Sequence, residues 1–135
     1  MKYVDVKENL NSIISMVENA EEYVVLVSPY SNLEGWDKFK NAINKATKSG
    51  VKVDYYVRVG DGYTGIEGID VNLFEVPELH AKMFYSEKDA LISSGNLANN
   101  PDINWVCILQ TEQEKNELRE FFNNHIKPVA SKYEG

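Results

Sequence analysis

Residues 79–97 read LHAKMFYSEKDALISSGNL, and they join a histidine and a lysine two residues apart to a Ser-Gly-Asn turn. Side chains alternate between the two faces of an extended strand, so His80, Lys82 and Phe84 are expected to share one face. The apolar run at 90–92 follows a polar turn and predicts a second short strand. The stretch therefore predicts a hairpin with polar groups at its open end.

These polar groups are of the kind that phosphoryl transfer needs. The second strand is expected to bring Ser94 and Asn96 toward His80 and Lys82. A transferring phosphoryl group spreads negative charge over its oxygens, so the protein mainly has to position it and stabilise that charge. Lys82, Ser94 and Asn96 are suitable donors, and His80 is the candidate nucleophile or base. An ordinary hairpin with one half-exposed histidine is the alternative interpretation, because a lone His-x-Lys pattern recurs by chance.

The stretch resembles the signature of the phospholipase D superfamily, which is His-x-Lys, four residues, an acidic residue and, after a short strand, Gly-Ser-x-Asn. In this chain Glu87 stands where the family usually has Asp, and Ser93-Ser94-Gly95-Asn96 stands where it has Gly-Ser-x-Asn. The resemblance implies two overlapping sets of residues, a catalytic set of His80, Lys82 and Asn96 and a phosphate-binding set of Lys82, Ser94 and Asn96.

The carboxylate that orients the histidine in this family is shifted or missing. Active members often carry it as Asn-x-Glu shortly after the motif, but Asn104 has no glutamate two residues later. Asp102 is the nearest carboxylate that could orient His80, although a turn explains this residue equally well. Glu87 is the second candidate acid, either for orienting the histidine or for a structural role.

The amino-terminal half predicts alternating helices and strands, as the resemblance also implies. Apolar residues at helical spacing predict a first helix of roughly four turns after a possible N-cap at Asp5. A buried strand is expected at 23–27, ending at Ser-Pro-Tyr, and a second helix at 36–46. A strand at 51–57 would then pair in parallel with the first strand through a right-handed crossover.

The remaining segments complete the expected domain. Residues 60–68 contain four glycines and are expected to form a loop. Strands are expected at 71–76 and 105–109, and Thr111 with Glu114 predicts a capping box at the start of a final helix.

At 135 residues the chain has a common size for one domain. Residues 1–135 are therefore expected to form a single phospholipase D-like α/β domain, with a mixed, mostly parallel sheet and helices on both faces. We expect no membrane insertion and a cytoplasmic location, because the sequence shows no long apolar run and no secretory signal pattern. Cys107, the single cysteine, lies in an apolar run, which agrees with a reducing compartment.

The resemblance also implies a mechanism and a homodimer. Family members that hydrolyse phosphodiesters use two facing copies of the constellation, and this chain has one; His125 is expected to be structural. In a homodimer His80 of one subunit would form a phosphohistidine, and His80 of the other would donate a proton to the leaving oxygen. No metal or cofactor is expected, because the sequence has no HExxH motif, CxxC pair or Asp-x-Asp cluster.

Three functions from different classes remain open. The resemblance favours a phosphodiesterase that cleaves nucleic acid, whereas the net charge of −7, from 21 acidic and 14 basic residues, is unusual for a nucleic-acid partner. The alternatives are an inactive binding or regulatory module with the same fold and, less favoured, a phospholipid phosphodiesterase. A solvated helix face is the preferred interpretation of the lysines Lys38, Lys40, Lys45, Lys48 and Lys52.

Overall fold

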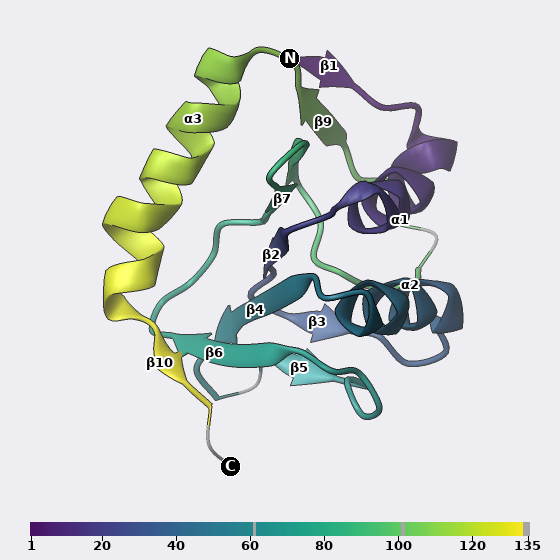
Figure 1. Cartoon of the computed structure of the whole chain (residues 1–135), viewed down its shortest axis with the longest axis vertical. Coiled ribbons are helices and arrows are strands. Elements are labelled where there is room, and N and C mark those ends of the chain that lie inside the picture. The colour runs from purple at the N-terminus through teal and green to yellow at the C-terminus, as the bar shows by residue number, and fades with distance from the viewer. Residues whose placement is uncertain (61, 101, 134–135) are drawn as a thin grey trace.

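The computed structural model describes residues 1–60, 62–100 and 102–133. An eight-stranded sheet has the order β1-β9-β8-β7-β2-β4-β6-β10, and a small second sheet pairs β3 with β5. Figure 1 shows α1 and α2 on one side of the large sheet and α3 on the other. The predicted α/β domain with helices on both faces of the sheet is therefore confirmed.

The helical segments are η1 (Val6–Glu8), α1 (Asn9–Asn19), α2 (Asp37–Lys48), α3 (Glu112–Phe121), the π-helical turn η2 (Phe122–Ile126) and the 3-10 turn η3 (Lys127–Val129). The strands are β1 (Lys2–Tyr3), β2 (Tyr23–Val27), β3 (Ser31–Asn32), β4 (Lys52–Arg58), β5 (Tyr63–Thr64), β6 (Asn72–Val76), β7 (Met83–Ser86), β8 (Ala90–Ser93), β9 (Val106–Leu109) and β10 (Ser131–Lys132).

The sheet is mixed, but the expectation that it is mostly parallel was wrong. The β2–β4 and β4–β6 pairs are parallel, and every other pair in the large sheet is antiparallel. The reason is connectivity: α2 crosses over between β2 and β4, whereas a short turn joins β7 to β8 and the segment between Ser93 and Val106 returns the chain to pair β9 with β8, and antiparallel strands need no crossover. The edge strands β1 and β10 also pair in the antiparallel sense.

Local signals in the sequence set the helix ends. The carboxylate of Asp5 accepts a hydrogen bond of 2.9 Å from the backbone N–H of Lys7 and caps η1, which leads into α1. Gly50 ends the turn after α2 with a φ of 94°, a value that glycine adopts without strain. The capping box of Thr111 and Glu114 at the start of α3 is present as predicted.

The glycine-rich segment 60–68 is more ordered than expected, although Asp61 lies outside the described residues. Strand β5 within it pairs in parallel with β3, next to the end of β2. Gly62 accepts a 2.7 Å hydrogen bond from the backbone N–H of Ser31. A Cβ at Gly62 would collide with the backbone of Arg58, so the close approach of these segments requires glycine.

Two hydrophobic cores lie on the two faces of the sheet. The larger one joins the sheet to α1 and α2 and includes Phe39, Tyr55 and Phe84, all fully buried. The smaller one, on the α3 side, includes Met83 and Tyr85. The alternation predicted for this hairpin strand is therefore confirmed within β7. No helix in the described ranges is long and apolar enough to cross a membrane.

Candidate functional site

Strand directions bring the polar residues of the hairpin to one end of the large sheet. Strands β2 and β4 run toward this end, and β7 starts there, because Val27 at the end of β2 pairs with Met83 at the start of β7. Strand β8 ends there and β9 starts there, since Ser93 pairs with Val106. We call this end of the sheet the site edge. His80, Lys82, Ser94 and Asn96 all lie in the segments that meet at it.

His80 and Lys82 lie just ahead of β7 and not within it, because the strand begins at Met83. The ladder still reaches Lys82, whose carbonyl accepts a 3.2 Å bond from the N–H of Ser93. The Lys82 ammonium donates a 3.1 Å bond to the carbonyl of His80 and keeps two further protons for other acceptors. His80 is exposed and Lys82 is half-buried. The pair therefore presents an imidazole and an ammonium at the surface.

The segment before His80 is fixed by an arginine that the sequence did not single out. Arg58, the last residue of β4, donates a 3.2 Å bond from Nη1 to the carbonyl of Leu79. The turn before Leu79 contains Glu78, which has a φ of 57° and is the one described non-glycine residue with positive φ. Such a backbone is costly for most residues and persists where its surroundings hold it. Arg58 also adds a second cation to the site edge.

Asn96 is held by the end of β2. Its side-chain oxygen accepts a 3.0 Å bond from the backbone N–H of Tyr30 and lies 3.5 Å from the hydroxyl of Ser28. The buried Ser28 hydroxyl also accepts a 2.8 Å bond from the N–H of Leu97. With its oxygen engaged, the amide of Asn96 has its two N–H donors left for a ligand.

Ser94 contacts an asparagine instead of a carboxylate. Its hydroxyl donates to Oδ1 of Asn104 at 3.2 Å and accepts from the N–H of Trp105 at 2.9 Å. Asn104 is positioned through its carbonyl, which accepts a 2.7 Å bond from the side chain of the buried Asn9. Gly95 makes room for this amide, because a Cβ there would lie 2.6 Å from Cγ of Asn104. The Ser94 hydroxyl is thus oriented by protein groups on both sides.

The two candidate acids lie in different places. Asp102 is exposed on the segment before β9, where its backbone N–H donates a 3.2 Å bond to the side chain of Asn100. This contact agrees with the interpretation of Asp102 as a turn residue, which the sequence also allowed. Asp102 lines the same surface hollow as Asn96 and Asn104, and no described carboxylate hydrogen-bonds to the His80 side chain.

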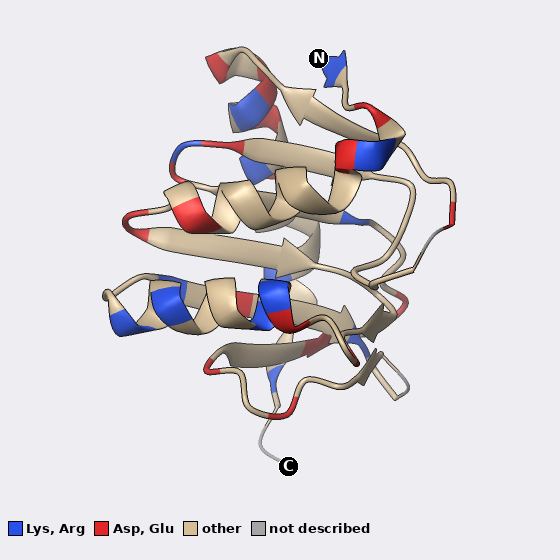
Figure 2. Ribbon diagram, turned by 90° about the vertical axis from the view of Figure 1, so that its right-hand side faces the viewer, with Lys and Arg blue, Asp and Glu red and all other residues tan. Residues whose placement is uncertain are grey.

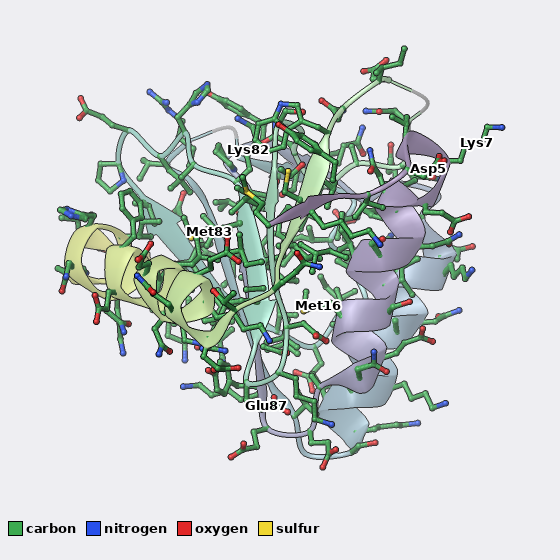
Figure 3. The ribbon with its side chains drawn as sticks, turned by 90° about the horizontal axis from the view of Figure 1, so that it is seen from above. Asp5, Lys7, Met16, Lys82, Met83 and Glu87 are labelled. Carbon is green, nitrogen blue, oxygen red and sulfur yellow. The ribbon has the colours of Figure 1, made fainter. Side chains whose placement is uncertain are left out.

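Glu87 lies far from the site edge, in the turn between β7 and β8. Figure 3 shows Lys82 and Glu87 at opposite ends of the molecule. The Glu87 carboxylate accepts backbone bonds from Glu21, Glu22 and Tyr23 at 2.8, 3.1 and 3.2 Å, just where β2 begins. Partial burial alone would raise the pKa of Glu87, but the backbone donors outweigh it and hold that pKa below its usual value. Of the two roles considered for Glu87, the contacts support the structural one.

A second His-x-Lys pattern, His125-Ile126-Lys127, lies outside the site edge. It occupies η2 and the start of η3, where the backbone is helical and residues two apart do not face each other. The His125 ring lies 5.0 Å from the ring of Phe121. Elsewhere in the described ranges, no group of three or more His, Cys, Asp or Glu side chains is arranged to hold a metal ion.

Sequence reasoning missed the residues that support the site edge, namely Arg58, Ser28 and Asn104. Arg58 ends β4, Ser28 follows β2 and Asn104 precedes β9, and such a position is a weak signal by itself. Their roles depend on contacts with segments that lie 10 to 69 positions away in the chain.

No family model matches the sequence, and neither does any curated protein. Solved structures do match. Nuc from Salmonella typhimurium, a phospholipase D family member, aligns with a TM-score of 0.71 over 99% of this chain and 96% of its own, at 15% identity. NucT from Helicobacter pylori aligns with a TM-score of 0.79 over 94% of this chain and 92% of its own, at 13% identity.

A third similar structure belongs to a larger protein. TrmBL2, an archaeal chromatin protein described as having a novel mode of DNA binding, aligns with a TM-score of 0.67 at 15% identity. The alignment covers 97% of this chain and 54% of TrmBL2. At such identities the likeness establishes the fold and leaves the activity to be argued from the site.

Proposed function

Because the chain has the phospholipase D fold, we propose that it is a metal-independent phosphodiesterase that cleaves nucleic acid as a homodimer. One observation carries the proposal: His80, Lys82, Ser94 and Asn96 meet at the site edge although they come from separate segments. The candidate nucleophile and the candidate donors for a phosphoryl group therefore lie in segments that meet at one end of the sheet. Phosphoryl transfer depends mainly on such positioning and charge stabilisation.

The donors at the site edge are fixed before any substrate binds. The oxygen of Asn96 is held by the N–H of Tyr30, so its N–H donors point away from that contact. The Lys82 ammonium is held by the carbonyl of His80 and carries the positive charge. Donors that are already in place cost little reorganisation when charge develops on the phosphoryl oxygens.

The exposed apolar residues support a dimer across the site edge. Tyr30 follows β2, Val59 follows β4, and Ile103 and Trp105 precede β9, with exposed fractions of 46, 52, 86 and 44%. Tyr3, in β1, lies edge-on to Trp105 with ring centroids 6.4 Å apart. Five of the ten large exposed apolar side chains in the described ranges therefore lie near the candidate site, as expected of a surface that a second copy covers.

In such a dimer the two copies of His80 divide the chemistry. The imidazole of one copy attacks phosphorus and forms the P–N bond while the P–O bond to the leaving group breaks. The second copy's His80, protonated at the start, donates its proton to the leaving oxygen and then accepts a proton from the attacking water. Water cleaves the P–N bond and returns both imidazoles to their starting states.

Charge limits the kind of nucleic-acid contact. Figure 2 shows basic residues along α2, where Lys38, Lys45 and Lys48 are exposed and Lys40 is half-buried, in agreement with a solvated face. At the site edge the cations are Lys82 and Arg58. A chain with a net charge of −7 and few cations at its site should bind a short stretch of phosphodiester, with a shallow dependence of affinity on salt.

A second candidate function is a binding or regulatory module that has lost turnover. The observation that favours it is the amide of Asn104 beside Ser94, together with the lack of a described carboxylate partner for His80. Without such a partner the imidazole is not held in one tautomer. The phospholipid phosphodiesterase remains a third candidate, because the apolar residues at the site edge would also suit a lipid surface.

One set of assays separates the three. The purified chain is incubated with bis(4-nitrophenyl) phosphate, single-stranded DNA or phosphatidylcholine vesicles in the presence of EDTA. The proposal predicts hydrolysis of the first two and a loss of several orders of magnitude in His80→Ala. Anion binding without turnover would favour the module, and hydrolysis restricted to the vesicles would favour the lipid enzyme.

Mixed dimers test the shared site. A His80→Ala chain paired with an intact chain retains one imidazole, which cannot both attack phosphorus and protonate the leaving oxygen in the same step. The mixed dimer should be nearly as inactive as the double variant. Half of the parental activity, or a strictly monomeric active protein, would contradict the mechanism.

A further inference from the structure

A cavity of about 500 Å³ lies on the α3 side of the sheet, and none of the residues of the candidate site lines it. Its walls come from β2, β4, β6 and β7 on one side and from the chain between Arg119 and Ala130 on the other. It is separate from the site edge, where the segments around Ser94 and Asn96 line a different hollow. Its size is that of sites for single small molecules.

The cavity exists because α3 stands away from the sheet. This helix, seen on its own side of the sheet in Figure 1, buries none of its residues. The closer packing comes from the following turn η2, through the buried side chains of Phe122 and Ile126. The middle of the sheet is therefore left open beneath α3.

The floor of the cavity is aromatic. The register puts Tyr56 beside Phe74 and Val25 beside Tyr85, with these side chains on the same face. The rings of Tyr56 and Phe74 are stacked with centroids 4.6 Å apart, and Phe122 meets Tyr56 edge-on at 4.9 Å. Tyr56, Tyr85 and Phe122 are buried and Phe74 is half-buried, so a planar ring would stack on the open face of Phe74.

The rim is basic in an acidic protein. Three cations, Lys52, Lys127 and Arg119, line the cavity against one carboxylate, Asp54, which leaves a net charge of +2 in a chain of net charge −7. Asp54 is already engaged, by the Lys52 ammonium at 3.5 Å and the Asn72 amide at 2.9 Å. Burial and this carboxylate raise the pKa of Tyr56 to about 12. Tyr56 therefore remains a neutral hydroxyl at neutral pH.

Arg119 is a fixed charge at the wall. Its Nη2 donates a 3.0 Å bond to the carbonyl of Ser86, and its guanidinium carbon lies 5.9 Å from the centre of the Tyr85 ring. Its Nε is buried and has no hydrogen-bond partner in the described part of the chain. The bond to Ser86 therefore holds the positive charge of Arg119 in place at the cavity wall.

We propose that this cavity binds a small aromatic anion, a planar ring that carries a phosphate or carboxylate group. The ring stacks on Phe74, next to Tyr56, and the anion lies toward Lys127 and Arg119. The positive charge favours an anion, since the rim carries a net charge of +2 in a chain of net charge −7. The concave shape selects a small molecule over a flat protein partner.

The test uses the full chain and calorimetric titration with adenosine 5′-monophosphate. Adenosine, which has the ring alone, and inorganic phosphate, which has the anion alone, serve as half-ligands for comparison. Indole-3-acetate serves as the carboxylate probe. We expect at least one of the two aromatic anions to bind tenfold or more tightly than either half-ligand. Their relative affinities then identify the preferred anionic group.

Three variants locate the site. Lys127→Gln should weaken binding of the aromatic anion several-fold and is expected to fold, since Lys127 is exposed. Lys48→Gln on α2, on the other side of the sheet, is the matched control and should bind like the parent. Lys82→Met should also retain binding, because Lys82 belongs to the site edge.

Several outcomes would overturn the proposal. The first is that neither aromatic anion binds at millimolar concentration. The second is that adenosine and its monophosphate bind with equal affinity, and the third is that binding is lost in Lys82→Met alone. An affinity that falls as the protein concentration rises would show instead that a second copy occupies the face.

Discussion

Replacing Glu87 with Gln tests whether the acidic residue of the motif supports the fold or the site. In the structure its carboxylate accepts three backbone N–H bonds from Glu21, Glu22 and Tyr23. The substitution keeps the side-chain length and one acceptor oxygen but removes the charge. Hydrogen bonds to a charged group contribute about 1.5–3 kcal/mol each, so the loss of charge and of one acceptor should cost about 2 kcal/mol.

Thermal unfolding followed by circular dichroism would measure this cost. For a chain of this size, 1 kcal/mol corresponds to about 4 °C in Tm, so Glu87→Gln should lower Tm by about 8 °C at neutral pH. The matched control is Glu120→Gln, at an exposed position of α3, which should leave Tm nearly unchanged. Anion affinity and any turnover, measured below the unfolding range, should match the parent because Glu87 lies away from the site edge.

The pH dependence follows from the sign of the pKa shift. The backbone donors hold the pKa of Glu87 below its usual value in the folded state. Its stabilising contribution is therefore present above the unfolded pKa and is lost as the pH falls through the folded pKa. The Tm difference between parent and variant should shrink from neutral pH toward pH ~3. Unchanged stability together with reduced turnover would refute the structural role.

Three further changes probe the supports of the site edge. Gly95→Ala should displace the amide of Asn104, since the new Cβ would lie 2.6 Å from its Cγ; we expect weaker phosphate binding by titration, restored in a double variant with Asn104→Ala. Ser28→Ala removes the acceptor of the Leu97 N–H and should cost about 1–3 kcal/mol in urea unfolding, with phosphate affinity reduced in the same variant. Thr111→Ala removes the capping box and should cost about 1 kcal/mol, with phosphate binding unaffected.

Segments whose signal is local could be predicted from the sequence. The continuous apolar run of β2, the helical spacing of α2 and the capping box of α3 each lie within a few residues, and all three elements are present. The edge strands could not be predicted in this way. Two-residue strands such as β1 and β10 exist only through their partners in β9 and β6, which lie far away in the sequence. The expectation of a mostly parallel sheet was wrong for a related reason, because hairpins at the carboxyl-terminal half add antiparallel strands.

The candidate site shows the same division between local signals and contacts with distant segments. The motif identified the side chains that meet at the site edge, because it is a spacing pattern within one hairpin. It could not identify what fixes them. The oxygen of Asn96 is held by a residue 66 positions away, and the segment at Leu79 is held by Arg58 at the end of another strand. Such support comes from strand order, which the spacing of the motif does not encode.

Binding and turnover place different demands on this site, and the structure separates them. Binding a phosphate group needs donors fixed in space, and Asn96 and Lys82 are held by backbone groups that do not involve the His80 side chain. Turnover needs in addition an imidazole in a defined protonation state, which depends on its surroundings and on a second copy. His80→Ala should therefore abolish hydrolysis while phosphate affinity stays within a few-fold of the parent. If both are lost together, the imidazole itself organises the anion site, and the fixed donors do not suffice for binding.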